Sequence, residues 1–175
     1  LSYDVFGYYL YLPAAFIHGE LGGFDFKEEV FEQYQPAGSY DHSIIAEKTG
    51  KHVLKYPIGM AVLYLPFFLL AHLFALLSPY AADGFSTPYQ FAISLAGISY
   101  AILGLFLLRK VLLRFFHDHI VAMMLGIYVL ASNYLNYAAI DTAMPHNALF
   151  TVFVLILCLT IRWHESPNRK TALYL

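Results

Sequence analysis

Two acids, a lysine and a histidine stand out in this sequence because each lies beside a long apolar segment. Asp4 is the only charged residue among six aromatic ones in LSYDVFGYYLYLPAAF. Lys55 and Tyr56 precede one apolar segment, and Asp141 and His146 lie in a short turn between two others. A carboxylate can take a proton from a hydroxyl, and a lysine can stabilise negative charge that develops on a phosphate. Ionisable groups at membrane depth are costly and tend to be functional.

Each of these residues also has a simpler structural role. Asp4 could cap the helix that follows it, and Lys55 could extend its ammonium to phospholipid headgroups. Asp141 could form a tight turn, and His146 could cap a helix or bond a carbonyl. The residue types alone therefore leave structural and chemical roles open.

Four long segments without Asp, Glu, Lys or Arg must position these residues. Each has the length, about 20 residues, that a helix needs to cross a hydrocarbon core of about 30 Å. The composition agrees, with 59% hydrophobic residues, 13% charged residues and a mean hydropathy of +0.58. The sequence predicts an all-α polytopic membrane helical bundle, with three transmembrane helices in residues 86–161. The segments are Pro57–Leu77, Ser86–Leu108, Ile120–Ile140 and Thr142–Ile161.

The distribution of basic residues predicts the orientation in the membrane. All four arginines lie within Arg109–Arg114 and Arg162–Lys170, which the positive-inside rule places in the cytoplasm. Residues 1–56 carry eight acids, four lysines and no arginine, and residues 78–85 carry only Asp83. Those two stretches are expected outside, and the turn that contains Asp141 is then outside as well.

The segment Pro57–Leu77 joins two stretches that are both expected outside. A full crossing would put Asp4 on the cytoplasmic face, away from Asp141. Because Pro66 interrupts the backbone hydrogen bonds of a helix, we expect a re-entrant or kinked embedded helix over residues 57–77. The apolar length alone favours a true span, and that alternative stays open.

The remaining parts are expected at the two membrane surfaces. Residues 1–56 form a first extracytoplasmic loop with membrane-surface helices at Val5–Ile17 and Phe26–Gln35, the second capped by Asp25. Residues 162–175 are expected to hold a cytoplasmic loop and the start of the next span. Since the sequence lacks an initial methionine and ends in an apolar run, we expect a fragment of a longer protein.

Three phrases resemble the membrane-embedded GT-C glycosyltransferases, in the branch of the protein mannosyltransferases and aminoarabinose transferases. They are SYDVFGYYLYLPAAFI, KYPIGMAVLYLPFFLLAH and MPHNALFTVFVL. The likeness covers nearly all of the chain and the N-terminal third or so of such an enzyme. It implies an incomplete GT-C-like fold in a bacterial inner membrane, with the active site on the extracytoplasmic side.

The resemblance also implies roles for residues of the first loop. Asp4 matches the catalytic base, and Lys55 with Tyr56 occupies the place of the element that contacts the lipid-linked phosphate. Val5 stands where the protein mannosyltransferases have a second acid. A lipid or glycan acceptor is therefore favoured over a protein.

Asp141 matches the acid of the second extracytoplasmic loop, and His146 matches a nearby polar position. His146 and Tyr8 are candidates for orienting the acceptor. Such an enzyme moves a sugar from a polyprenyl phosphate with inversion, among membrane lipids, and no nucleic acid partner is expected. No cofactor is predicted, and a divalent metal is left open because two groups are too few to define a site.

Two alternatives to an enzyme remain. In a transporter or flippase-like protein, the Pro66 segment would form part of a substrate path. In a non-catalytic membrane assembly subunit, Asp4 and Asp141 would lie on opposite faces of the membrane.

Overall fold

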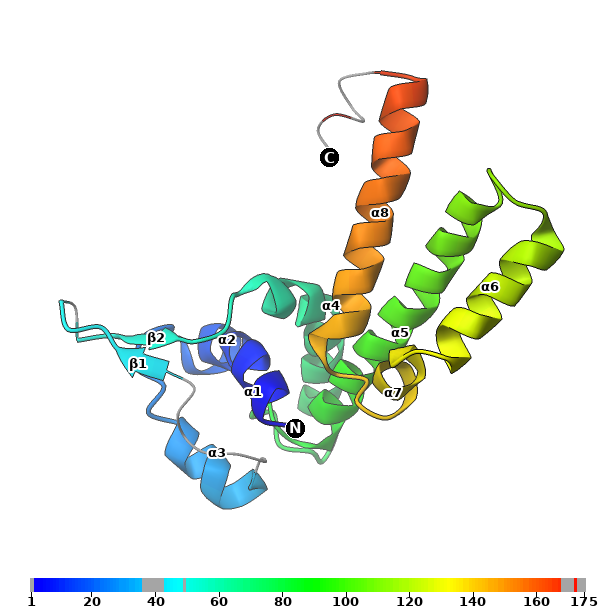
Figure 1. Ribbon diagram of the computed structural model, residues 1–175. Helices are drawn as coiled ribbons and strands as arrows, with labels where there is room; N and C mark the ends of the chain where they lie inside the picture. Colours follow the sequence, from blue (N-terminus) through cyan, green and yellow to red (C-terminus); the bar gives the residue numbers. More distant parts are fainter. Residues whose placement is uncertain (1, 36–42, 49, 168–171, 173–175) are drawn as a thin grey trace. The chain divides into compact units, whose positions relative to one another are not determined.

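The computed structural model describes residues 2–35, 43–48, 50–167 and 172, which are mainly helical (Figure 1). The chain divides into two compact units, Leu1–Ala96 and Gly97–Leu175, with the boundary inside one long helix. The elements in chain order are α1 (Tyr3–Tyr9), α2 (Tyr11–Pro13), the π-helix η1 (Ala14–His18), α3 (Lys27–Tyr34), β1 (Ser43–Ile45), β2 (His52–Leu54), α4 (Gly59–Leu76), α5 (Thr87–Leu112), α6 (Asp118–Leu130), α7 (Tyr134–Ala139) and α8 (Pro145–Glu165).

Three of these helices, α4, α5 and α8, are long and apolar enough to cross a membrane. The predicted helical fold with membrane-spanning segments therefore agrees with the structure. A small two-stranded sheet adds to it: β1 and β2 pair antiparallel, with Ser43 opposite Leu54 and Ile45 opposite His52. The sequence analysis did not predict these strands.

Helix α4 does not turn back at Pro66, so the re-entrant alternative for residues 57–77 is wrong, while the kinked helix stays a prediction. It is one helix of 18 residues with Pro66 inside it. A single proline removes one hydrogen bond, whereas a reversal needs turn residues, and Leu65 and Phe67 on either side supply none. Met60, Tyr64 and Phe68 recur every four residues on its buried face.

The chain reverses after α4, over residues 77–86. Tyr89, in the first turn of α5, contacts the middle of α4: its ring centroid is 5.5 Å from that of Phe68. Its hydroxyl is 2.5 Å from Nδ1 of His72. The connection between the two helices therefore runs back along α4.

Helices α1 and η1 cover part of the predicted surface helix Val5–Ile17, but several of their aromatic rings form the core of the first unit. Phe6 and Tyr9 are buried, and the Tyr9 hydroxyl donates to the carbonyl oxygen of Gly84. Gly84 has φ +88°, and a Cβ there would lie 2.7 Å from Cβ of Pro13. Only glycine fits this turn, which connects α4 to α5 and packs against α2 and η1.

Helix α3 begins at Lys27, and the predicted cap by Asp25 is wrong, since Phe26 holds the capping position without a side-chain hydrogen bond. Asp83 instead stabilises the turn that leads into α5. Its Oδ1 accepts the backbone N–H groups of Phe85 and Ser86, at 2.8 and 3.0 Å, just before α5. The hydroxyl of Tyr34 donates to Oδ2 of the same carboxylate, which ties α3 to this turn.

In the second unit, the apolar segment Ile120–Ile140 is broken, so the prediction of one continuous spanning helix there is wrong. The break lies between α6 and α7, where the Ser132 hydroxyl donates to the carbonyl of Tyr128 at 2.6 Å. Such back-bonding by serine competes with the helix. With 13 residues, α6 is about 20 Å long, short of a hydrocarbon core of about 30 Å.

Helices α5 and α8 approach closely where glycines lie. A Cβ on Gly97 would lie 1.5 Å from the carbonyl oxygen of Thr142, and one on Gly104 would lie 2.5 Å from Oγ1 of Thr151. The Thr151 hydroxyl donates to the carbonyl of Tyr100 at 2.5 Å. The predicted start of a further span falls largely on residues 168–171 and 173–175, outside the described residues.

Candidate functional site

Tyr56 is the centre of a group of polar and aromatic residues in the first unit. Its side chain is 7% exposed, and its hydroxyl donates to Oδ1 of Asp4 at 2.5 Å. The hydroxyl of Tyr11 donates to the backbone carbonyl of Tyr56 at 2.6 Å. These two bonds fasten the segment before α4 to helices α1 and α2. We call the group the Tyr56 cluster; its members are Tyr3, Asp4, Tyr8, Tyr11, Lys55 and Tyr56.

Burial, the hydrogen bond to Asp4 and the nearby charge of that carboxylate all raise the pKa of the Tyr56 phenol above its ordinary value of about 10. The phenol therefore keeps its proton at neutral pH and acts as a donor. The second oxygen of Asp4, Oδ2, accepts no hydrogen bond from the described residues. Asp4 can thus accept a further proton donor while Tyr56 holds its first oxygen.

Lys55 brings a cation to the same cluster. Its Nζ lies 5.7 Å from the ring centroids of both Tyr3 and Tyr56, within the range of a cation–π interaction. The side chain is exposed, and among the described residues no carboxylate lies within 4.0 Å of its ammonium. The ring of Tyr8 packs on that of Tyr56, with 4.6 Å between the centroids. Lys55 is therefore accessible to an anion beside this aromatic surface.

The helical period explains why these side chains meet. Asp4, Tyr8 and Tyr11 are spaced i, i+4 and i+7, which places them on one side of the helical segment formed by α1 and α2. The sequence analysis missed Tyr3 and Tyr11 as members of the cluster. The spacing from Asp4 was the signal that could have identified Tyr11.

Helix α1, which carries Asp4 and Tyr8 of the Tyr56 cluster, contacts the segment just before α5. Phe6, two residues after Asp4, stacks on Phe85 with 5.7 Å between ring centroids. The basic residues Arg109 and Lys110 are in the last turn of the same helix. This contact lies at the end of α5 that is away from Arg109.

Asp141 and His146 belong to the second unit, and neither a hydrogen bond nor an ion pair joins their side chains. Asp141 is exposed in the turn after α7 and is 3.5 Å from the amide nitrogen of Asn136. The ring of His146 packs on that of Tyr137, with 3.9 Å between centroids. Four of the six predicted site residues thus meet in the Tyr56 cluster: Asp4, Tyr8, Lys55 and Tyr56.

No group of three or more His, Cys, Asp or Glu side chains that could hold a metal ion occurs among the described residues. Comparisons of the chain with protein-family models, with curated proteins and with solved structures find no match.

Proposed function

We propose that this chain is part of a membrane-embedded glycosyltransferase of the GT-C type, which moves a sugar from a polyprenyl phosphate to an acceptor hydroxyl. The observation that supports it most is that Asp4 and Lys55 share one cluster: the carboxylate accepts the Tyr56 hydroxyl, and the ammonium is 5.7 Å from the same ring. Transfer from a sugar phosphate needs a base for the acceptor and a cation for the leaving phosphate.

The reaction would proceed in one displacement. Oδ2 of Asp4 takes the proton of the acceptor hydroxyl as its oxygen attacks the anomeric carbon. The bond from that carbon to the phosphate oxygen breaks, and the electron pair leaves with the polyprenyl phosphate. Attack from the face opposite the leaving group inverts the anomeric configuration. General base catalysis of this kind typically contributes about 10² to 10⁴ in rate.

The other members of the cluster would position these groups. The Lys55 ammonium stabilises the phosphate charge, and its two aromatic neighbours limit its hydration. Tyr56 holds Oδ1 of Asp4, which fixes the direction of Oδ2. The exposed edges of Tyr3 and Tyr8 offer rings for a sugar or an isoprenoid chain.

The position of the cluster near the start of α5 supports an extracytoplasmic active site. The positive-inside rule assigns the Arg109 end of α5 to the cytoplasm, so its other end faces outward. The contact between Phe6 and Phe85 supports this placement, which requires that α4 does not cross the membrane completely.

Asp4→Asn tests the proposal, with Asp25→Asn as a matched exposed control from the same unit. The protein in membranes is given radiolabelled polyprenyl-phosphate sugars, and the labelled product is followed by its extraction behaviour. We expect transfer in the wild type and in Asp25→Asn, and loss of transfer in Asp4→Asn with membrane insertion retained.

In the alternative of a transporter or flippase-like protein, the Pro66 segment would form part of the substrate path, and Pro66 lies inside the single helix α4. The break between α6 and α7 still resembles the interrupted helices of transporters. The same assay separates the two functions. A transporter would move the labelled lipid or sugar across the membrane without forming a new glycosidic bond, and Asp4→Asn would leave that movement intact.

A further inference from the structure

A pocket of about 200 Å³ lies between α5 and α8 in the second unit, at the C-terminal ends of both helices. Its inner wall is apolar and includes Leu107 and Val111 from α5 and Cys158 from α8. The sulfur of Cys158 is 4.0 Å from the carbonyl oxygen of Leu107, so the helices are close at this level.

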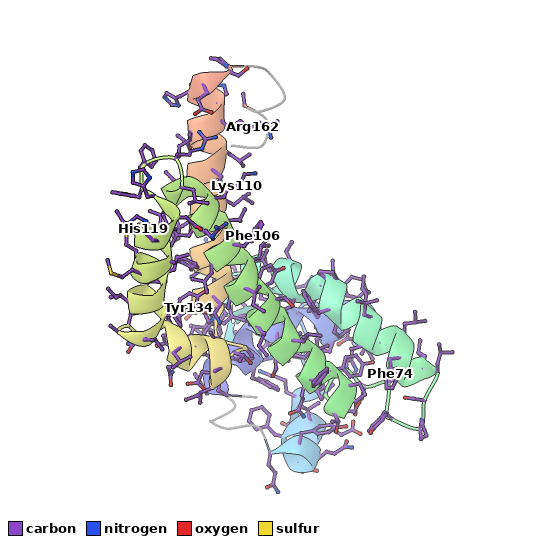
Figure 2. The ribbon with its side chains drawn as sticks, turned by 90° about the vertical axis from the view of Figure 1, so that its right-hand side faces the viewer. Phe74, Phe106, Lys110, His119, Tyr134 and Arg162 are labelled. Carbon is purple, nitrogen blue, oxygen red and sulfur yellow. The ribbon has the colours of Figure 1, made fainter. Side chains whose placement is uncertain are left out.

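The outer wall of the same pocket is cationic. Lys110, Arg114 and Arg162 line it, and Lys110 and Arg162 lie toward the same end of the unit in Figure 2. Arg114 pairs with Glu165, whereas Lys110 and Arg162 have no carboxylate within 4.0 Å among the described residues. The rim therefore keeps an excess of positive charge that an anion can neutralise.

The apolar wall and the cationic wall of the pocket are expected at different depths in the membrane, which suits an amphiphile. Helix α5 has 26 residues, a length of about 39 Å, which exceeds a hydrocarbon core of about 30 Å. Its last turn therefore reaches the headgroup level, with the apolar wall of the pocket below it. An occupant with one anionic end and one apolar end would satisfy both walls.

We propose that this pocket binds an anionic phospholipid of the cytoplasmic leaflet, with the headgroup phosphate at the Lys110–Arg162 rim and an acyl chain against the apolar wall. Basic residues at this level attract anionic lipids, each contributing about a fivefold gain in association. The assignment to the cytoplasmic leaflet follows from the arginine-rich ends of both helices. It does not depend on the proposed transfer reaction.

Trp163 makes the proposal measurable, because it is the only tryptophan of the chain and follows Arg162 directly. The protein is reconstituted in phosphatidylcholine vesicles that contain a fixed fraction of brominated phosphatidylglycerol or of brominated phosphatidylcholine, and quenching of tryptophan fluorescence is compared. We expect stronger quenching by the anionic lipid. Lys110→Gln and Arg162→Gln should each lower this selectivity about fivefold.

Two further variants separate the pocket from a diffuse surface charge. Arg109→Gln removes a cation that pairs with Asp118 outside the pocket, at 2.6 Å, and should leave most of the selectivity in place. Cys158→Phe fills the apolar wall without a change of charge and should abolish the selectivity.

Quenching by brominated phosphatidylcholine reports insertion of every variant. Equal quenching of the wild type by the two lipids would overturn the proposal. So would an equal loss of selectivity in Arg109→Gln and Lys110→Gln, because it would assign the preference to general surface charge. If Cys158→Phe fails to insert, the comparison of those two charge variants decides.

Discussion

The interiors of the two units are built from different kinds of residues. In the first unit the core consists of aromatic rings: the largest fully buried side chains of the described residues include three tyrosines and four phenylalanines, all before residue 97. In the second unit the only member of that set is Val121. There the helices approach at small residues, with Gly97 against the backbone of Thr142 and Gly104 against Thr151.

This difference in buried residues decides which side chains of each unit are able to hold a reactive group in place. A tyrosine fills an apolar core and still carries a hydroxyl, so it can hold a carboxylate or a carbonyl in place, as Tyr56 holds Asp4 and Tyr9 holds Gly84. Glycine and threonine let helices approach closely, and the Thr151 hydroxyl is already used in a bond to the Tyr100 carbonyl. The first unit therefore contains the proposed catalytic groups, and the second sets the spacing of its helices.

Removal of one central ring should have the largest effect on the first unit. Phe68 is fully buried and contacts the rings of Tyr9 and Tyr89. Phe68→Ala leaves a cavity and should cost about 4 kcal/mol in the free energy of unfolding. The control is Leu70→Ala, because Leu70 lies on the same helix and is 68% exposed. Denaturant unfolding in detergent measures both; equal losses would refute an aromatic core.

The second unit should respond to added volume instead. Gly97→Ala places a methyl group 1.5 Å from the Thr142 carbonyl oxygen, so the backbone must shift, at about 2 kcal/mol or more. Gly126→Ala meets nothing within 4 Å and should be neutral or slightly stabilising. The two melting temperatures in detergent provide the test. If Gly97→Ala melts like Gly126→Ala, the close approach of the helices is incorrect.

The loss of one buried hydroxyl should have a smaller effect. Tyr9→Phe keeps the ring but leaves the Gly84 carbonyl without this donor, at about 1.5 kcal/mol. Tyr80→Phe, at an exposed tyrosine of the same unit, should change the free energy of unfolding little. The free energies of unfolding of the two variants are measured side by side. Equal values would mean that the hydrogen bond from the Tyr9 hydroxyl does not contribute to stability.

The smallest expected effect is a loss of the stability that Tyr56 contributes, at alkaline pH. Because the pKa of Tyr56 is raised in the folded protein, its contribution to stability is fully present below pH about 10 and is lost as the pH rises through the folded pKa. The advantage of the wild type over Tyr56→Phe should therefore shrink by about 1 kcal/mol near pH 11. A difference that stays constant from pH 7 to about 11 would show that the phenol does not titrate differently on folding.

The sequence predicted the helical class and the apolar segments because lipid imposes both the length and the absence of charge. It also singled out Asp4, Lys55 and Tyr56, which the structure brings together. The helix face that carries Asp4, Tyr8 and Tyr11 follows directly from their spacing.

Two local features were not predictable in the same way. The effect of Pro66 was overestimated, because neighbouring contacts in an apolar helix can compensate for one lost hydrogen bond. The effect of Ser132 was overlooked, because its bond to the Tyr128 carbonyl depends on the rotamer and not on hydropathy. The aromatic residues of α1 were expected at the membrane surface, but hydropathy does not distinguish a buried ring such as Phe6 from a lipid-facing one.

The central claim is that the reactive groups lie in the first unit, with Asp4 as the base. The most direct test is the single-turnover rate of sugar transfer from a polyprenyl phosphate, measured for Asp4→Asn beside Asp141→Asn. The account predicts a fall of about 10² to 10⁴ for Asp4→Asn and a smaller fall for Asp141→Asn. A rate that Asp4→Asn leaves unchanged, or that Asp141→Asn lowers more, would contradict it.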